Sequence, residues 1–269
     1  MNLSKRLMVE PGTKAGIPKR DPRSTHGFKA REDAEETLQK NTAHLSELQY
    51  VLYAENKHAV LVILQAMDAG GKDGTIRHVM TGLNPQGTRV TSFKVPTPEE
   101  SAHDFLWRIH RHVPGRGEIG IFNRSHYEDV LVVRVHKLVP REVWSKRYDE
   151  INAFERTLSE SDVKIFKFFL HISKEEQKER FQQRLQDPTK RWKVSAADFA
   201  ERKYWDDYME AYEDALTFCS TDWAPWYVIP ADKKWYRNFA VSQIIADGLK
   251  GLHMRLPEPS LDLSHISLE

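Results

Sequence analysis

The segment AMDAGGKDGT, residues 66–75, carries the residue types of a phosphate-binding loop. It follows the apolar run 59–64 and precedes a stretch compatible with a helix. In such a loop, glycines let backbone N–H groups turn toward phosphate oxygens, a helix N-terminus adds its positive dipole, and Lys72 adds a mobile cation. The alternative is a glycine-rich turn between a strand and a helix that binds nothing. The loop residues predicted to contact a nucleotide are Gly70, Gly71, Asp73, Gly74 and Thr75.

This loop departs from the pattern G-x-x-x-x-G-K-[ST] at two positions. Ala66 replaces the first glycine, and Asp73 replaces the Ser or Thr that normally holds Mg²⁺. The loop also contains an acid, Asp68. Because a carboxylate repels phosphates unless a divalent cation lies between them, we predict that Asp68 binds a metal ion or acts as a base.

A second polar segment follows the apolar run 119–122. Its first residue, Asn123, stands where a neighbouring strand of a nucleotide-binding sheet often ends in an acid that holds Mg²⁺. Glu128 is either the N3 residue of a capping box or part of the site. Asp129 and Arg124 offer a carboxylate for a metal and a guanidinium for a phosphate, and the alternative for both is a surface ion pair.

A basic segment, TKRWKV at 189–194, lies between two predicted helices. The pattern Ser-x-x-Glu at 173–176 and the pattern Ser-x-x-Asp at 195–198 are typical of helix starts. A short basic segment between two helices has the form of a lid over about 184–203, able to close over phosphates and exclude water. An ordinary solvated connection is the alternative. Arg184 is the best single candidate on the approach to this lid.

The remaining elements alternate between strands and helices. A helix is predicted over 31–55, where leucines recur at helical spacing. Strands alternating with helices predict an α/β fold with a parallel sheet covered on both faces and ligands at the carboxyl ends of the strands. Both polar segments described above lie at such ends. The strands are predicted at 59–64, 90–95, 118–122, 164–172 and 226–229.

Composition limits what surrounds these segments. The 269 residues are 40% hydrophobic, enough for one α/β domain over 31–256, with an N-terminal basic arm at 1–30 and a C-terminal tail at 257–269. We expect the arm to drape over the surface. A net charge of +1 argues against a protein surface that binds nucleic acid through its overall charge. No segment of the sequence is long and apolar enough to span a membrane. The single cysteine, Cys219, and the lack of an apolar N-terminal signal predict a cytoplasmic protein.

Three ordered motifs carry a family resemblance. They are DAGGKDGT at 68–75, FNRSHYED at 122–129, and DPTKRWK at 187–193 followed by WDDY at 205–208. The chain resembles the family-2 polyphosphate kinases from about residue 27 to residue 252. Much of that family reads Asp-Arg-Ser in the second motif, whereas this chain reads Asn-Arg-Ser. That departure is similar to the subgroup that accepts nucleoside monophosphates as well as diphosphates.

The resemblance implies a P-loop kinase-like fold, with a parallel five-stranded sheet, helices on both faces and a helical lid. It implies a polyphosphate-dependent phosphotransferase that makes ATP, or GTP, from AMP or ADP with Mg²⁺ or, as the other option, Mn²⁺. Its partners would be polyphosphate, adenine nucleotides and guanine nucleotides, with no nucleic acid and no membrane, and the chain would form a homo-oligomer.

Phosphoryl transfer needs a site rich in cations and metal, with one or two acids. We expect Asp68 and Asp129 to hold the metal and Glu128 to place the nucleotide acceptor. Catalysis is assigned to Asp68, Lys72, Arg124, Asp129 and Arg184, and polyphosphate binding to Lys72, Arg124, Arg184, Lys190 and Lys193.

Two other functions stay open at this point. An ATP-dependent nucleotide kinase would share the sheet, loop and lid, but it is expected to carry Ser or Thr at the position of Asp73. A non-catalytic P-loop protein that binds nucleic acid through its basic arm would have no use for Asp68, and its affinity should fall steeply with salt.

Overall fold

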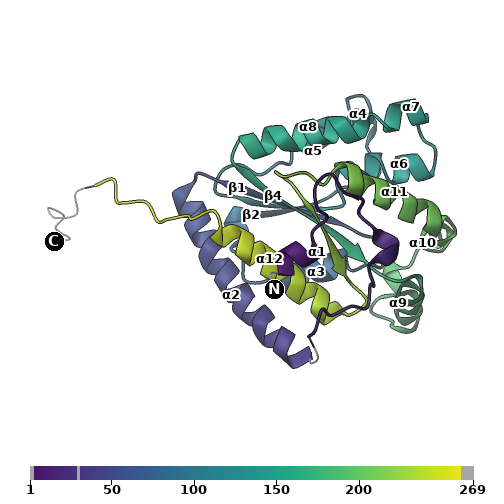
Figure 1. The fold of residues 1–269 in the computed structure, drawn as a ribbon, viewed down its shortest axis with the longest axis horizontal. Helices are drawn as coiled ribbons and strands as arrows, with labels where there is room; N and C mark the ends of the chain where they lie inside the picture. Colours follow the sequence, from purple (N-terminus) through teal and green to yellow (C-terminus); the bar gives the residue numbers. More distant parts are fainter. Residues whose placement is uncertain (1–2, 29–30, 262–269) are drawn as a thin grey trace.

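The fold is built on a five-stranded parallel sheet, which Figure 1 shows in the middle of the molecule. The structure is a computed structural model that describes residues 3–28 and 31–261. The strands lie side by side in the order β2, β3, β1, β4, β5. Their bounds are β1 Ala59–Gln65, β2 Thr88–Ser92, β3 Ile119–Asn123, β4 Val163–His171 and β5 Trp226–Pro230. The predicted five-stranded parallel sheet is therefore confirmed.

Burial explains the position of each strand. β1 reads AVLVILQ, and all seven residues are buried, as expected for a central strand covered on both faces. β2 is an edge strand with partly exposed residues, so its hydrophobic signal is weaker. The sequence predicted this strand over 90–95, whereas the structure places it at Thr88–Ser92. The other four strands differ from their predicted bounds by one residue, at one end for β1 and β5 and at both ends for β3 and β4.

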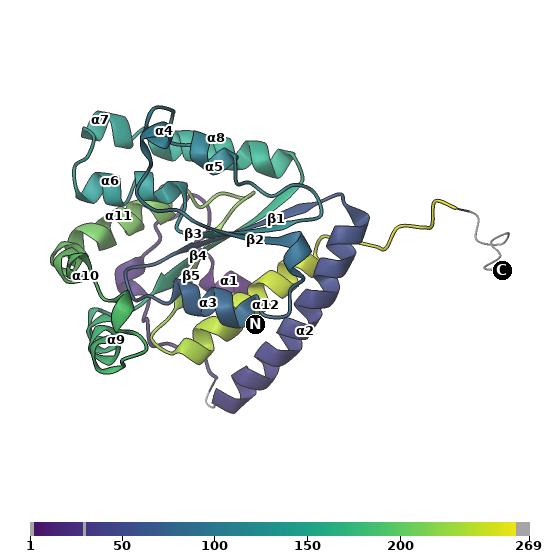
Figure 2. The same ribbon diagram turned by 180° about the vertical axis from the view of Figure 1, so that it is seen from behind.

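Helices cover both faces of the sheet. Figures 1 and 2 show α2 (Arg31–Glu55), α3 (Lys72–Val79) and α12 (Lys234–Lys250) on one face and α8 (Arg147–Glu160) and α11 (Trp205–Phe218) on the other. The predicted long helix is confirmed, because α2 spans Arg31–Glu55. None of the helices in the described residues is long and apolar enough to cross a membrane. The other helices are α1 Leu3–Leu7, α4 Pro98–Ser101, α5 Trp107–His110, α6 Val132–Val135, α7 Arg141–Trp144, α9 Lys174–Gln186 and α10 Ala196–Glu201.

The described part of the N-terminal segment packs into the core. Leu7, Val9 and Ile17 are at most 2% exposed, so they are core residues and not part of a loose surface arm. The backbone N–H of Val9 donates to the carbonyl of Trp226 over 2.8 Å, which extends the sheet beyond β5. This packing covers an edge that would otherwise be open to other chains. A domain boundary near residue 30 stays a prediction.

Candidate active site

The phosphate loop turns sharply between β1 and α3. Gly71 has φ +107° and Ala69 has φ +60°, both in the left-handed region. A Cβ on Gly70 would lie 2.5 Å from Cβ of Ala66 and 2.8 Å from the carbonyl oxygen of Met67. Two glycines in a row are therefore needed, the first for space and the second for its backbone conformation. The turn brings the N-terminus of α3, with its positive dipole, to the carboxyl end of the sheet.

Lys72 folds back over this loop. Its Nζ donates to the carbonyl of Ala66 over 3.0 Å. Burial and the nearby charge of Arg124 lower the pKa of Lys72, against the opposite effect of the surrounding acids. An arriving phosphate would offer this ammonium a stronger acceptor than a neutral carbonyl. Thr75 is fully buried, and its hydroxyl donates to the carbonyl of Gly71 over 3.1 Å. Thr75 therefore stabilises the start of α3 and is not placed to contact a nucleotide.

Parallel pairing of β1 with β3 brings the second motif beside the loop. Leu64 pairs with Asn123 at the ends of these strands, and the N–H of Arg124 donates to the carbonyl of Leu64 over 3.1 Å. Arg124 has φ +64°, which turns the chain sharply after the strand. Its Nη2 then lies 3.1 Å from Oδ1 of Asp68. The amide of Asn123 donates to Oδ1 of Asp73 over 2.9 Å, so both acids of the loop meet the second motif.

Glu128 faces these cations. The hydroxyl of Ser125 accepts from the N–H of Tyr127 over 3.2 Å, and the reciprocal bonds of a capping box with Glu128 are not formed here. Burial raises the pKa of Glu128, while the charges of Arg124 and Lys72 act in the opposite direction. The carboxyl of Glu128 therefore lies in the electrostatic field of the two cations, and its role in the site stays a prediction.

Asp129 points into a different environment. Its Oδ1 lies 2.9 Å from Nη1 of Arg147, and both side chains are at least 86% buried. Burial raises the pKa of Asp129 to about 6, against the effect of Arg147. Asp129 and Arg147 therefore form a buried ion pair, and not the surface ion pair that was the alternative. For Asp129 to join Asp68 at a metal, its carboxylate would have to be shared with or released by Arg147, so the metal role of Asp129 stays a prediction.

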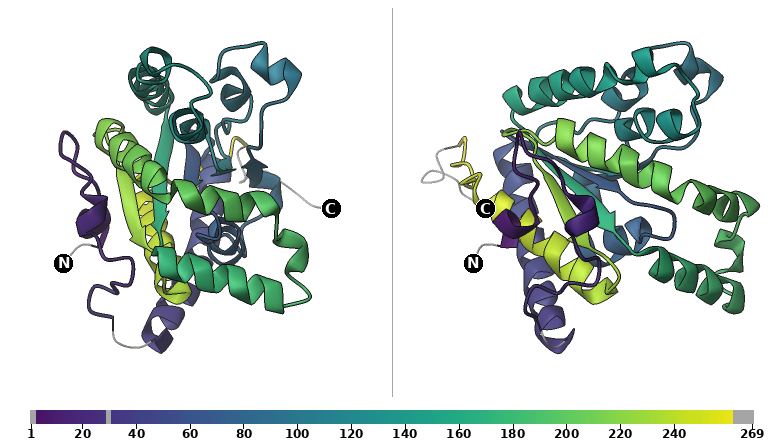
Figure 3. Two further views of the ribbon diagram at one scale, coloured as in Figure 1. Left: turned by 90° about the vertical axis from the view of Figure 1, so that its right-hand side faces the viewer. Right: turned by 45° about the vertical axis from the view of Figure 1, so that its right-hand side comes forward.

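The basic segment lies between two helices, as expected. The hydroxyl of Ser173 caps α9 by accepting from the N–H of Glu176 over 3.1 Å, and Ser195 caps α10 by accepting from the N–H of Asp198 over 3.2 Å. Both predicted helix starts are therefore confirmed. Figure 3 shows α9 and α10 projecting beyond the carboxyl ends of the strands.

One cation of this segment already contacts the phosphate loop. Nζ of Lys193 lies 3.5 Å from Oδ2 of Asp73. Lys190 instead forms a local ion pair with Asp187 over 2.5 Å, and Arg184 lines the cavity described next. Asp73 is thus held by one contact from the second motif and one from the lid segment.

The loop, the second motif and the lid segment enclose a cavity of about 1140 Å³. Eleven cationic side chains line it against six acidic ones, so the cavity suits a polyanion. The cationic residues are Arg31, Lys72, Lys94, Arg124, Arg180, Arg184, Lys190, Lys193, Lys233, Lys234 and Arg237. Asp68 and Asp73 are among the acids on its wall, whereas Glu128 and Asp129 are not.

Comparison with known proteins identifies this arrangement. Residues 29–257 match the family described as Polyphosphate kinase 2. The chain belongs to the polyphosphate kinase 2 family. The resemblance inferred from the three motifs is therefore confirmed.

Relatives of this polyphosphate kinase 2 chain cover nearly its whole length. A protein of Meiothermus ruber named AMP/ADP-polyphosphate phosphotransferase is 53% identical over 98% of this chain and 100% of its own length. A protein of Rhodopseudomonas palustris named ADP-polyphosphate phosphotransferase is 48% identical, over 95% of this chain and 92% of its own. The crystal structure of polyphosphate kinase 2 from Arthrobacter aurescens superposes with a TM-score of 0.94 at 45% identity, covering 98% and 94% of the two chains.

Several residues of this polyphosphate kinase 2 site escaped sequence reasoning. Lys233, Lys234 and Arg237 line the cavity from the start of α12, directly after β5. The rule that ligands bind at the carboxyl ends of parallel strands applies to β5 as well, so it could have found the two lysines. Arg180 was not assigned a role from the sequence either. Its Nη1 donates to the carbonyls of two loop residues over 2.9 and 3.0 Å, so it holds the loop in place.

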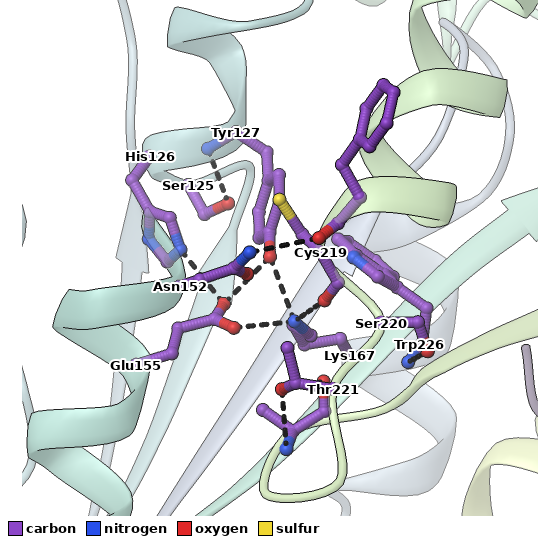
Figure 4. A network of polar contacts seen from close by, with 12 residues as sticks. Ser125, His126, Tyr127, Asn152, Glu155, Lys167, Cys219, Ser220, Thr221 and Trp226 are labelled. Atoms are coloured by element: carbon purple, nitrogen blue, oxygen red, sulfur yellow. Dashed lines mark hydrogen bonds and ion pairs between the residues drawn. The ribbon is translucent and has the colours of Figure 1, made fainter. Parts of the chain in front are cut away.

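A buried polar network holds Tyr127 of the second motif, as Figure 4 shows. Nζ of Lys167 donates to the hydroxyl of Tyr127 over 2.9 Å, to Oε2 of Glu155 over 2.5 Å and to the carbonyl of Cys219 over 2.6 Å. The hydroxyl of Tyr127 donates to Oε1 of Glu155 over 2.9 Å. Lys167 and Glu155 are fully buried, so β4 and α8 fix the segment that carries Arg124.

Proposed function

We propose that this protein transfers phosphate between inorganic polyphosphate and a nucleotide, making ATP from AMP or ADP, or GTP from the corresponding guanine nucleotides. The observation that carries the proposal is the cation-rich cavity at the carboxyl ends of the strands, with Asp68 inside its phosphate loop. Membership of the polyphosphate kinase 2 family and the name of the M. ruber relative support the same reaction. A polymeric anion accounts for a concentration of cations that one mononucleotide does not need.

In the forward direction, an oxygen of the nucleotide's terminal phosphate attacks the last phosphorus of polyphosphate. The bond from that phosphorus to its bridging oxygen breaks, and the chain leaves one phosphate shorter. Lys72 and Arg124 hold the phosphates at the transfer point, and Arg184 and Lys193 neutralise charge as the lid segment closes. These groups act by position and charge, without a covalent intermediate.

The loop fits a divalent cation. In residues 3–28 and 31–261, no group of three or more His, Cys, Asp or Glu side chains could hold a metal ion by itself. Mg²⁺ commonly takes one or two carboxylates together with substrate phosphates, and Asp68 on the cavity wall is such a carboxylate. When bound, Mg²⁺ would neutralise charge on the phosphate that moves. Mn²⁺ takes the same kind of ligand.

We also propose that Glu128 positions the acceptor, and that the enzyme accepts monophosphates as well as diphosphates. Cytoplasmic location and a homo-oligomer complete the proposal. Cys219 is buried and unpaired, which fits a reducing compartment. Tyr50 and Tyr53 on α2 are 67% and 57% exposed, and they offer apolar surface for contact with another copy.

The test is ATP formation from long-chain polyphosphate and Mg²⁺ with AMP or ADP as the acceptor. Lys72→Ala is the control for the site, EDTA the control for the metal, and a parallel reaction supplies ATP as donor. We expect product from both acceptors, lost in Lys72→Ala and with EDTA. Product from ADP alone would overturn acceptance of monophosphates. Activity only with the ATP donor would make the chain an ATP-dependent nucleotide kinase.

A further inference from the structure

Arg237 on α12 is a buried cation without an acidic partner. It is 2% exposed. Its Nε and Nη2 both donate to Oδ1 of the neighbouring Asn238, over 3.1 and 2.8 Å. Within the part of the chain that the structure describes, no carboxylate pairs with Arg237 and no hydrogen bond involves its Nη1. Burying a charge without a counter-charge is costly, and an anionic ligand bound beside the group would offset that cost.

The guanidinium lies directly against the phosphate loop. A Cβ on Gly71 would lie 1.9 Å from Nη1 of Arg237, and a Cβ on Gly74 would lie 3.1 Å from its Nη2. The space that other residues would fill with a side chain is therefore occupied by this guanidinium. Arg237 also lines the cavity, so a ligand bound there would lie next to it.

The neighbouring arginine differs because its donors are already used. Nε of Arg180 bonds to Glu176 over 2.7 Å, and its Nη atoms donate to four backbone carbonyls over 2.5 to 3.1 Å. Arg180 therefore has a structural role in holding the loop. Arg237 brings a second positive charge to the same place and has a donor to spare.

The start of α12 adds to this local field. The helix is 17 residues long, it has no side-chain cap, and no acid lies in its first turn. Its positive dipole end is therefore not neutralised by the helix itself. Lys233 and Lys234 stand at this end, and both line the cavity. Partial burial and the charge of Arg180 lower the pKa of Lys234, against the effect of Glu176 and with Arg237 contributing to the lowering.

We propose that Arg237, Lys234 and the N-terminus of α12 form a second phosphate subsite, which binds a phosphate of the donor chain that is not transferred. This inference rests on the proposed function. The donor then lies across two helix N-termini, those of α3 and α12, with the reacting end at Lys72. A phosphate bound equally before and during transfer lowers the KM for the donor and leaves kcat unchanged.

The experiment compares Arg237→Met, Arg237→Lys and Lys234→Gln with Arg77→Gln, which removes an exposed cation outside the cavity. kcat and KM are measured for long-chain polyphosphate and for tripolyphosphate at saturating ADP, and for ADP at saturating polyphosphate, together with the rise in Tm that polyphosphate causes without nucleotide. Hydrogen bonds to charged groups contribute roughly 1.5–3 kcal/mol, which corresponds to about a 10- to 150-fold higher KM in Arg237→Met.

We expect that increase for the polymer, with kcat and the KM for ADP unchanged, a smaller Tm shift, and partial recovery in Arg237→Lys. Lys234→Gln should move the KM for the polymer in the same direction by about 3- to 10-fold, whereas Arg77→Gln should not. An unchanged KM for the polymer in both Arg237→Met and Lys234→Gln would overturn the subsite, as would an increase confined to the KM for ADP.

The subsite can be tested even if one variant is unstable. If Arg237→Met does not fold, Lys234→Gln decides, because Lys234 is exposed and its removal leaves the core intact. The experiment also distinguishes a wrong subsite from a wrong proposed function. If the unaltered protein makes no ATP from polyphosphate, the proposed function is wrong, whereas normal donor use by both variants refutes the subsite alone.

Discussion

Nη2 of Arg124 lies 3.1 Å from Oδ1 of Asp68, although the two residues are 56 positions apart in the sequence. The contact joins the phosphate loop to the second motif across the neighbouring ends of β1 and β3. Before substrate binds, the guanidinium offsets the charge of the only acid between the strand and Lys72. We propose that entering phosphates give Arg124 further anionic acceptors, so that the carboxylate of Asp68 can be shared with a metal ion.

Replacing the carboxylate of Asp68 should therefore stop catalysis without unfolding the protein. We expect Asp68→Asn to lower kcat about 10²- to 10⁴-fold, a range typical of a lost catalytic acid or base, with little change in Tm. Initial rates and thermal melts measure both quantities. Asp222→Asn, at an exposed acid outside the cavity, is the matched control. Near-normal turnover of Asp68→Asn would show that Asp68 only holds Arg124 in place.

Glu128 should matter more for monophosphate acceptors than for diphosphates. Its carboxylate lies within the electrostatic field of Arg124 and Lys72. A monophosphate has one phosphate fewer than a diphosphate, so it depends more on a side chain that positions it against the donor. For Glu128→Ala we expect kcat/KM to fall roughly 10- to 100-fold with AMP and by less than about 3-fold with ADP. Glu47→Ala, an exposed change on α2, controls for lost charge. Equal losses with both acceptors would contradict a positioning role.

Gly71 is constrained by its neighbour as well as by its backbone. Gly71 and Gly27 both have positive φ, +107° and +98°, but nothing lies within 4 Å of a Cβ on Gly27, whereas Nη1 of Arg237 lies 1.9 Å from a Cβ on Gly71. We expect Gly27→Ala to cost about 1–2 kcal/mol of unfolding free energy and to keep its activity. Gly71→Ala should cost more and abolish activity, as urea unfolding and rate assays would show. Similar effects on stability and rate would mean that Arg237 moves aside freely.

Local sequence was enough for the sheet and the phosphate loop. β1 is one continuous buried run, and the glycines and lysine that follow it act through their own backbone and charge. Parallel pairing of consecutive motifs then brings Asn123 and Arg124 to the same edge as Asp68. These features depend on residues close together in the chain or on one general rule of parallel sheets.

The features that were missed depend on contacts distant in sequence. Nothing in the pattern around Asp129 indicates that Arg147 on α8 will neutralise it. Arg237 looks like an ordinary helix residue until α12 packs beside the phosphate loop. The N-terminal segment has few apolar residues, but Leu7 and Val9 are buried against β5. Tertiary packing decides these three cases, and a single sequence does not specify it directly.

Acid should destabilise the protein through a buried histidine. Burial lowers the pKa of His171, whose Nε2 lies 3.1 Å from the carbonyl of Arg20. Below the unfolded-state pKa of about 6.5, the unfolded chain takes up a proton that the folded protein does not, so the unfolding free energy falls as pH decreases, by at most about 1.4 kcal/mol per pH unit for this group. Urea unfolding between pH 7.5 and 5 should show a shallower fall in His171→Gln. The exposed change His78→Gln should keep the full slope, and equal slopes in the two variants would contradict the assignment.

The buried pair of Lys167 and Glu155 should act as one unit (Figure 4). Lys167→Met leaves a carboxylate in the core without its cation, and we expect a loss of roughly 3–5 kcal/mol in unfolding free energy. Adding Glu155→Gln should recover part of that loss, because the uncompensated charge is then gone. Lys164→Met, a partly exposed change on the same strand, should cost little. Urea unfolding of the single and double variants measures the coupling. Additive losses would show that the two residues stabilise the fold independently, and that the network does not fix Tyr127 and the second motif as a rigid body.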